Sequence, residues 1–274
     1  MTKKIRVFQI AYNEETLASV DPCFVPLNNL ANERPDWSEY WPVRKVLMNE
    51  HFAEDEYIGF FSPRFTQKTM MTGADVLAAI ETFDAEVFSF SPYFDISALF
   101  LNAVLQGEHY HPGLLDAMRD FVAELGVPLR VDTLVADHQT TIFCNYVVAK
   151  PALWKKWLVW GERLFEVCER GEGELAQKMA ALTNYTRGDH PMKVFVMERM
   201  MSLLLEVEGL KAKHCVDLRR APLAGRNVER VYPIVVGLDA LKGQYRSTGQ
   251  IMFLRCYDAL RQHVLKEMGA IRAA

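Results

Sequence analysis

DEYIGFFSPRF, residues 55 to 65, is the stretch from which the fold of this chain is most directly predicted. A short apolar run bounded by polar residues, as at 57–61, is typical of a buried strand. Ser62, Pro63 and Arg64 then begin a polar loop, and ligands of open α/β sheets bind just beyond the carboxyl ends of strands. We therefore expect Ser62 and Arg64 at a binding edge. The alternative is that Pro63 only ends a core strand and Arg64 is solvated.

The segments on either side complete an α/β pattern. IRVFQIA at 5–11 predicts a first parallel strand, and a short apolar piece follows at 24–27. A helix starting near Glu39 leads into the strand at 57–61, which is half of a βαβ unit. DAEVFSF at 84–90 predicts another strand that also ends in Ser-Pro. We expect a mainly parallel central sheet flanked by helices, with both Ser-Pro turns at one edge.

The rest of the chain predicts further helices and strands. Expected helices cover 96–105, 114–125, a long segment from Pro151, 193–206 and 250–268. Expected strands cover 129–135, 142–149, 210–218 and 232–238, and loops cover 184–191 and 219–230. The aromatic residues after Pro151 recur near helical spacing without interleaved basic residues, so we interpret them as core or interface rather than a base-stacking platform.

Composition excludes several classes of protein. The 274 residues carry a net charge of -4, which argues against a basic nucleic-acid-binding surface. No signal peptide and no apolar run of membrane-spanning length is recognised, so we expect a cytoplasmic protein. The arginines of 219–230 leave contact with the inner face of a membrane as an alternative. The five cysteines are widely spaced and predict neither disulfides nor a zinc site.

Common catalytic motifs are absent from the sequence. There is no GxGxxG or GxxxxGK[ST] phosphate loop, no GxSxG elbow and no HExxH helix. His109 and His111 form a potential ligand pair without an obvious third ligand. Asp137-His138 and Asp189-His190 are potential acid/base pairs, although adjacent residues on a strand or helix point apart.

Glu198 lies in an otherwise apolar helix, where a buried carboxylate needs a partner or a purpose. It is therefore a candidate catalytic group. An ion pair with Arg199 or Lys193 is the alternative explanation.

The order of these pieces resembles a glycosyltransferase-like family of bacterial capsule, exopolysaccharide and lipopolysaccharide loci. The resemblance rests on IRVFQIAYNE, WSEYWPVRKVLMN, DEYIGFFSPRF, FDAEVFSFSPYFD, GEHYHPGL, CNYVVAKPALWKKWLVWGERLFE and MKVFVMERMMSLLL, in this order over about residues 3 to 207. It implies the nucleotide-diphospho-sugar transferase (GT-A) fold over 1–208, with 209–274 as a C-terminal extension packed on the same domain. It also implies transfer of a sugar from a nucleotide-sugar donor to a surface glycan or lipid-linked glycan acceptor.

The sequence departs from the pattern after the central strand. Such families commonly carry a run of the type HYRR there, and most GT-A enzymes carry a DxD that holds a divalent metal. This chain has Ser-Pro-Arg-Phe at 62–65 and no DxD. We infer that Arg64, with Lys193 or Arg187, neutralises the leaving diphosphate without a metal. Mg²⁺ or Mn²⁺ remains the alternative.

The resemblance and the topology together predict the site residues. The predicted catalytic residues are Glu198, Asp189 and Arg64; the donor contacts are Gln9, Ala11, Tyr12, Ser62, Arg64 and Lys193; the sugar or acceptor contacts are Asp95, Asn145 and His109. Two other functions stay open: a non-catalytic binding or scaffolding protein of a glycan locus, and a sugar-nucleotide nucleotidyltransferase. The latter should carry a glycine-rich amino-terminal loop, which is missing.

Overall fold

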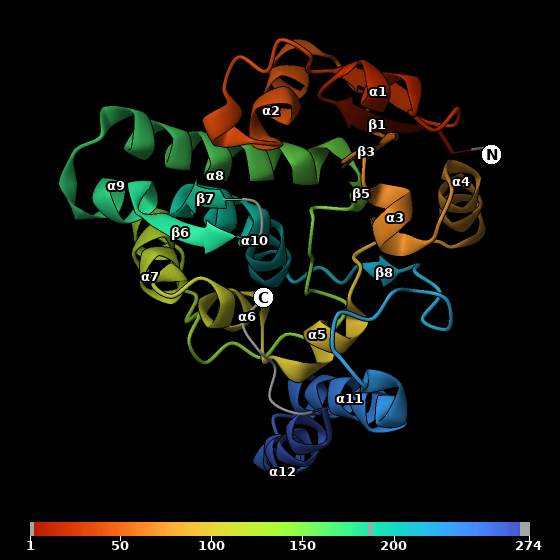
Figure 1. Cartoon of the computed structure of the whole chain (residues 1–274), viewed down its shortest axis with the longest axis vertical. Coiled ribbons are helices and arrows are strands. Elements are labelled where there is room, and N and C mark those ends of the chain that lie inside the picture. The colour runs from red at the N-terminus through yellow and green to blue at the C-terminus, as the bar shows by residue number, and fades with distance from the viewer. Residues whose placement is uncertain (1–2, 186–187, 269–274) are drawn as a thin grey trace.

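The computed structural model describes residues 3–185 and 188–268, and these form an α/β structure with a mostly parallel six-stranded central sheet flanked by helices (Figure 1). The strand order is β2-β1-β3-β5-β4-β8. The strands are β1 (Ile5–Ala11), β2 (Val25–Asn28), β3 (Tyr57–Phe61), β4 (Val87–Ser89), β5 (Val147–Ala149) and β8 (Lys213–His214). A separate hairpin pairs β6 (Leu182–Tyr185) with β7 (Gly188–Pro191).

One strand runs against the others. β1 pairs in parallel with β2 and β3, and β4 pairs in parallel with β8, whereas β5 lies antiparallel between β3 and β4. Because β3 and β4 are both antiparallel to β5, they are parallel to each other. The prediction that the two Ser-Pro turns lie at one edge of the sheet is therefore confirmed.

Helices connect the strands and cover both faces of the sheet. In the first half of the chain they are α1 (Glu14–Ala18), η1 (Pro35–Trp37), α2 (Tyr40–Asn49), α3 (Phe65–Thr69), α4 (Gly73–Thr82), α5 (Phe94–Leu99), α6 (Ala103–Tyr110) and α7 (Leu114–Glu124). In the second half they are α8 (Pro151–Arg170), α9 (Gly173–Ala180), α10 (Met192–Val207), η2 (Val228–Arg230), α11 (Tyr232–Thr248) and α12 (Ile251–Met268). None of the described helices is both long enough and apolar enough to pass through a membrane.

Strand periodicity divides the buried residues into two cores, one on each face of the sheet. Successive side chains of a strand point to opposite faces. Ile58 and Phe60 accordingly join a core built with α2, α7, α8 and α10, whereas Tyr57 and Phe61 join a core built with α4, α5, α11 and α12. All five residues of β3 are buried, so the central strand is covered on both faces as its apolar sequence predicts.

Two predicted strands are wrong. Residues 129–135 form turns and irregular structure, because the Asn102 side chain binds the Val131 and Leu134 carbonyl oxygens and no neighbouring strand pairs with them among the described residues. Residues 232–238 belong to α11: Val235 and Leu238 are buried on one helical face, and Pro233 occupies the first turn, where its missing N–H costs little.

Other predicted boundaries shift. Only the last three residues of 142–149 pair as a strand, and the expected helix 96–105 is divided between α5 and α6. The loop predicted at 184–191 includes part of the β6–β7 hairpin. The predicted strand 210–218 shortens to two residues.

The segment after residue 208 is tied to the sheet and to α5. Its strand β8 forms one edge of the sheet. The Asp95 Oδ2 atom accepts hydrogen bonds from the backbone N–H groups of Ala224 and Gly225, at 3.0 and 2.8 Å. The fully buried Lys242 of α11 donates to the carbonyl oxygens of Ser97 and Phe100. These bonds satisfy polar groups that would otherwise be costly to bury.

Candidate functional site

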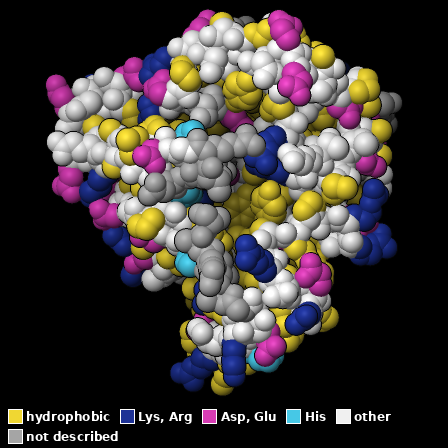
Figure 2. Space-filling view, in the orientation of Figure 1, with side chains coloured by type: hydrophobic (Ala, Val, Ile, Leu, Met, Phe, Trp, Pro, Cys, Tyr) yellow, Lys and Arg dark blue, Asp and Glu magenta, His cyan; other side chains and the backbone are white. Residues whose placement is uncertain are grey.

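Two adjoining cavities open beside the carboxyl end of β3. The chain leaves β3 at Phe61 and turns into α3, which carries Lys68. Because β5 is antiparallel, the residues just before it lie at the edge where β3 ends, and this brings Cys144 and Asn145 to the same place. Helix α10 supplies Glu198. Figure 2 shows a hollow with hydrophobic walls on this face of the molecule, with Lys and Arg side chains beside it.

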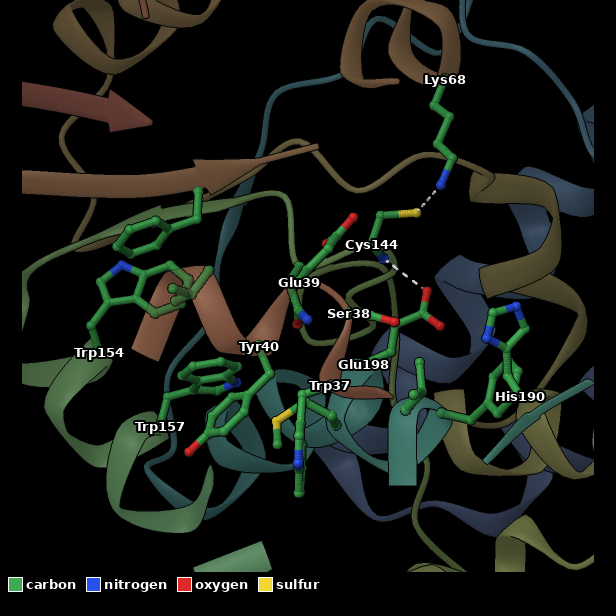
Figure 3. Close-up of a pocket in the computed structure, with 16 residues that line it drawn as sticks. Trp37, Ser38, Glu39, Tyr40, Lys68, Cys144, Trp154, Trp157, His190 and Glu198 are labelled. Carbon is green, nitrogen blue, oxygen red and sulfur yellow. Dashed lines mark hydrogen bonds between the residues drawn. The ribbon is translucent and has the colours of Figure 1, made fainter. Parts of the chain in front are cut away.

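The first cavity, which we call the aromatic chamber, has a volume of about 210 Å³. It is lined by Trp37, Ser38, Glu39, Tyr40, Val43, Phe60, Lys68, Cys144, Asn145, Trp154, Trp157, His190, Val194, Phe195, Met197 and Glu198. The indole and phenol rings gather on one side of it, and Lys68, Cys144 and Glu198 lie on the other (Figure 3).

The second cavity, which we call the basic chamber, has a volume of about 340 Å³. Its lining is Arg64, Lys68, Tyr93, Ile96, Gln106, Tyr110, His111, Phe143, Cys144, Phe195, Glu198, Arg199 and Ala224. Lys68, Cys144, Phe195 and Glu198 belong to both linings. The two chambers therefore meet at a lysine and a carboxylate.

Three charged groups interact at this junction. Burial raises the pKa of Glu39 from 4.5 to about 7. The positive charge of Lys68 lowers this pKa, and the negative charge of Glu198 raises it. Burial disfavours the charged form of Lys68, but attraction to Cys144, Glu198 and Glu39 outweighs it and raises the Lys68 pKa. Burial raises the pKa of Cys144 to about 12, so its thiol is protonated at neutral pH. The two carboxylates are then the negative charges that hold Lys68 as a cation.

Hydrogen bonds fix the orientation of two of these groups. Lys68 Nζ lies 3.0 Å from Cys144 Sγ, and the Cys144 N–H donates to Glu198 Oε1 at 3.2 Å (Figure 3). Glu198 Oε2 lies 3.4 Å from Arg199 Nη1, so the ion pair expected as an alternative is present. Its side chain nevertheless retains a 34% exposed fraction and faces both chambers. Glu198 can therefore reach a ligand while it remains paired.

The backbone around the chambers is strained. Ser38, Tyr93, Cys144 and Asn145 all have positive φ angles, of 47°, 63°, 60° and 51°. Each such residue costs about 1–3 kcal/mol, and such strain often lies at ligand sites. Ser38 also has a ψ of −127°, a region that favours glycine. Ser38 and Glu39 connect η1 to α2, and both line the aromatic chamber.

The predicted donor contacts on β1 and β3 lie largely in the sheet. Gln9 is buried, and its side-chain amide bonds to the backbone of this chain. It accepts a hydrogen bond from the Asp21 N–H and donates one to the Ser62 carbonyl oxygen. Ala11 is fully buried, and the buried Ser62 hydroxyl bonds the Tyr146 hydroxyl at 2.5 Å. These three side chains do not line either chamber. Tyr12 is partly buried. Burial raises the pKa of its hydroxyl, and the negative charge of Glu39 raises it further.

The two predicted cations take different places. Arg64 is exposed at the N-terminus of α3, where it bonds Gln67 and lines the basic chamber. Lys193 instead forms an ion pair with Asp36 at 2.6 Å and lies over the Trp37 ring. Lys193 lines neither chamber. Arg187 lies outside the described residues.

The remaining predicted residues are also divided. Asn145 lines the aromatic chamber, but Asp95 is fully buried and holds the backbone at 224–225. His109 is exposed and lines neither chamber. In the hairpin β6–β7, His190 lines the aromatic chamber whereas its neighbour Asp189 is exposed, as alternation along a strand requires.

Sequence reasoning missed Glu39, Lys68 and the indole walls. The sequence predicts Glu39 only as the start of a helix, and it predicts a polar loop at Lys68, where the structure has α3. Trp154 and Trp157 are buried core residues, as predicted, but they also line the aromatic chamber. The unusual clustering of WSEYW at 37–41 was the available signal.

Potential metal ligands are dispersed in the described part of the chain. Within 3–185 and 188–268, no three His, Cys, Asp or Glu side chains gather closely enough to hold an ion. The carboxylates of Glu39 and Glu198 are instead accompanied by the Lys68 ammonium group.

Comparison of the chain with protein-family models, with curated proteins and with solved structures found no match.

Proposed function

We propose that this protein is a glycosyltransferase that moves a sugar from a nucleotide-sugar donor to a bacterial surface glycan acceptor. The observation that carries the proposal is the junction of the two chambers, where Glu39, Glu198 and Lys68 interact. A carboxylate can act as a general base and a cation can stabilise a leaving diphosphate, so these groups beside a partly apolar cavity support glycosyl transfer. The mostly parallel sheet is compatible with the GT-A fold implied by the resemblance.

The basic chamber suits the diphosphate of the donor. Arg64 and Lys68 line it and can approach phosphate oxygens. Arg199 lines it too, but its guanidinium donates to the Ala103 and Phe195 carbonyl oxygens and to Gln106. We therefore assign phosphate contact to Arg64 and Lys68. Arg199, which pairs with Glu198, is assigned the role of positioning that carboxylate.

The carboxylates suit the proton transfer. A carboxylate of Glu198 or Glu39 accepts the proton of an acceptor hydroxyl as that oxygen bonds to the anomeric carbon. The bond between the anomeric carbon and the diphosphate oxygen breaks, and its electron pair leaves with the diphosphate. Lys68 and Arg64 stabilise the added negative charge. A pKa of about 7 leaves a large fraction of Glu39 ionised at neutral pH.

The test combines binding and turnover. Thermal unfolding is followed with a panel of nucleotide sugars, because a ligand that prefers the folded state raises its apparent stability. Release of nucleoside diphosphate is then measured with the donor that stabilises best. We expect Glu198→Gln and Lys68→Met to lower this release by 10²-fold or more. Lys211→Met removes an exposed lysine outside both chambers and serves as the control.

The outcomes separate the candidate functions. A failure of every nucleotide sugar to stabilise the protein would overturn the proposal. Stabilisation without turnover would favour the non-catalytic binding protein. Arg64→Ala tests the phosphate contact and should weaken binding of the nucleotide-sugar donor. If this variant instead kept full activity, and the activity were lost in chelator and restored by Mn²⁺, metal-independent stabilisation by Arg64 would be refuted.

A further inference from the structure

Aromatic rings form a connected wall on one side of the aromatic chamber. Trp37 and Tyr40 have ring centroids 5.3 Å apart, Tyr40 and Trp157 5.6 Å, and Trp157 and Trp154 5.5 Å. Trp154 in turn forms a T-shaped pair with Phe60, with ring centroids 4.9 Å apart. The rings support one another by tilted and edge contacts, which leaves the wall apolar and rigid. Each of these rings is at most 3% exposed, so the wall offers a ligand an apolar lining rather than an open ring face.

Hydrogen-bonding groups complete the chamber. Glu39, Glu198 and His190 line it (Figure 3). Trp157 Nε1 and Asn145 Oδ1 are buried and have no hydrogen-bond partner among the described residues. An unmet buried donor or acceptor costs about 1–3 kcal/mol, so a ligand that reaches these atoms after a small side-chain rotation would recover part of that cost.

The charges of the chamber indicate which ligand it accepts. Two carboxylates line it, and its one lysine, Lys68, is attracted to both. A phosphate or carboxylate ligand would be repelled here, whereas hydroxyl groups donate readily to carboxylates and to the Asn145 amide oxygen. A ring that is apolar on its C–H face and rich in hydroxyl donors at its edge matches both the wall and the polar groups.

We propose that the aromatic chamber binds an uncharged sugar ring, with its C–H groups against the apolar lining and its hydroxyls directed to Glu39, Glu198 and Asn145. A nucleobase could enter the same cavity, but it offers fewer hydrogen-bond donors to two carboxylates. The assignment of the ring to the acceptor or to the donor sugar rests on the proposed function. Binding of the ring itself does not.

The test uses simple glycosides, so it does not depend on turnover. The protein is titrated with uncharged methyl hexosides, followed by tryptophan fluorescence and by calorimetry. We expect saturable binding by at least one of them, and weaker or no binding of uridine, guanosine and glucuronic acid. Competition by a nucleotide sugar, but not by the nucleotide alone, would assign the chamber to the donor sugar. Simultaneous binding of both would assign it to the acceptor.

Substitutions locate the binding. Val194→Phe fills the aromatic chamber from α10 and should weaken the hexoside at least tenfold. Val159→Phe adds the same volume at an exposed position of α8 and should not change the affinity. Glu39→Gln keeps the shape of the site and should weaken binding several-fold, which covers the case that Val194→Phe does not fold.

The results bear separately on the two proposals. Absence of hexoside binding, stronger binding of a nucleoside, or equal effects of Val194→Phe and Val159→Phe would overturn the sugar-ring assignment. Hexoside binding without nucleotide-sugar turnover would leave that assignment standing and remove the proposed transferase activity.

Discussion

Glu39 acquires its unusual environment from the backbone immediately before it. Ser38 holds a conformation that favours glycine, and the chain then enters α2 with Glu39 facing the cavity. A carboxylate in such a place is held partly protonated near neutral pH because burial penalises its charge. Glu39 itself has ordinary helical backbone angles, so the strain is in Ser38 and the pKa suited to proton transfer is in Glu39. Neither property can be recognised from the sequence alone.

This residue predicts a pH dependence of stability. The folded-state pKa of Glu39 is raised, so between about pH 4.5 and 7 the folded protein keeps a proton that the unfolded chain releases. Its contribution therefore lowers the free energy of unfolding as pH rises through this window. Glu39→Gln removes the effect. The free energy of unfolding of the variant, relative to that of the parent, should therefore rise by about 1–2 kcal/mol from pH 4.5 to pH 8.

Urea unfolding at both pH values measures the difference. Glu14→Gln, on the exposed side of α1, is the matched control and should show no such gain. An unchanged difference for Glu39→Gln at the two pH values would contradict the raised pKa.

At the level of elements, the direction of β5 creates the site. This strand runs against β3 and β4, so its first residues, rather than its last, adjoin the carboxyl ends of its neighbours. Cys144 and Asn145 reach the junction for that reason. A parallel strand in the same position would have carried them to the opposite edge of the sheet.

The close contact of β3 with β5 predicts the effect of a single methyl group. A Cβ atom on Gly59 would lie 2.7 Å from Val148 Cγ2 and 3.0 Å from the Val147 carbonyl oxygen. Gly59→Ala should therefore destabilise the fold by about 1–3 kcal/mol through overpacking. Thermal or urea unfolding measures the change.

Gly237→Ala provides a control of opposite sign. This glycine lies within α11, and a Cβ there would meet nothing within 4 Å. Replacing a helical glycine by alanine should stabilise by about 0.5–1 kcal/mol. If Gly59→Ala were as stable as the parent, the β3–β5 contact would be looser than the structure indicates.

In the whole molecule, the C-terminal segment completes the core on one face of the sheet. Tyr257 and Val264 of α12 are buried in the same core as Phe61 and Phe88. Polar groups tie the segment down as well: His138 Nδ1 lies 2.5 Å from Asp239 Oδ2 on α11, which holds this helix against the loop after α7. Burial lowers the pKa of His138, but the hydrogen bond and charge of Asp239 outweigh it and raise that pKa.

A truncation after residue 208 should therefore not fold as a stable unit. It would expose the core beneath α11 and α12 and remove the Ala224 and Gly225 N–H donors of the buried Asp95 carboxylate. We expect a dye that binds exposed apolar surface to fluoresce strongly with the truncated chain, and its urea unfolding to lose cooperativity. A cooperative transition in the 1–208 fragment would instead make the extension a separable unit.

Local patterns were sufficient where an element is defined by its own residues. The bounds of β1 and β3 match the apolar runs, and α10 and α12 match helical periodicity within one or two residues. The same reasoning failed for 232–238, because the buried Val235 and Leu238 belong to a helical face that also includes Asp239 and Lys242. Polar residues on a buried face hide the period from a hydrophobic pattern.

The sequence by itself determined an α/β chain with a central buried strand, a polar turn after it, and Glu198 as an unusual carboxylate in an apolar helix. Only the tertiary structure decided which side chains share a cavity. Lys68, Glu39 and Glu198 are far apart in sequence, and they meet because α2, α3 and α10 converge at one edge of the sheet. The antiparallel direction of β5 brings Cys144 to the same place. Long-range pairing of strands and packing of helices fix such positions, and no local pattern encodes them.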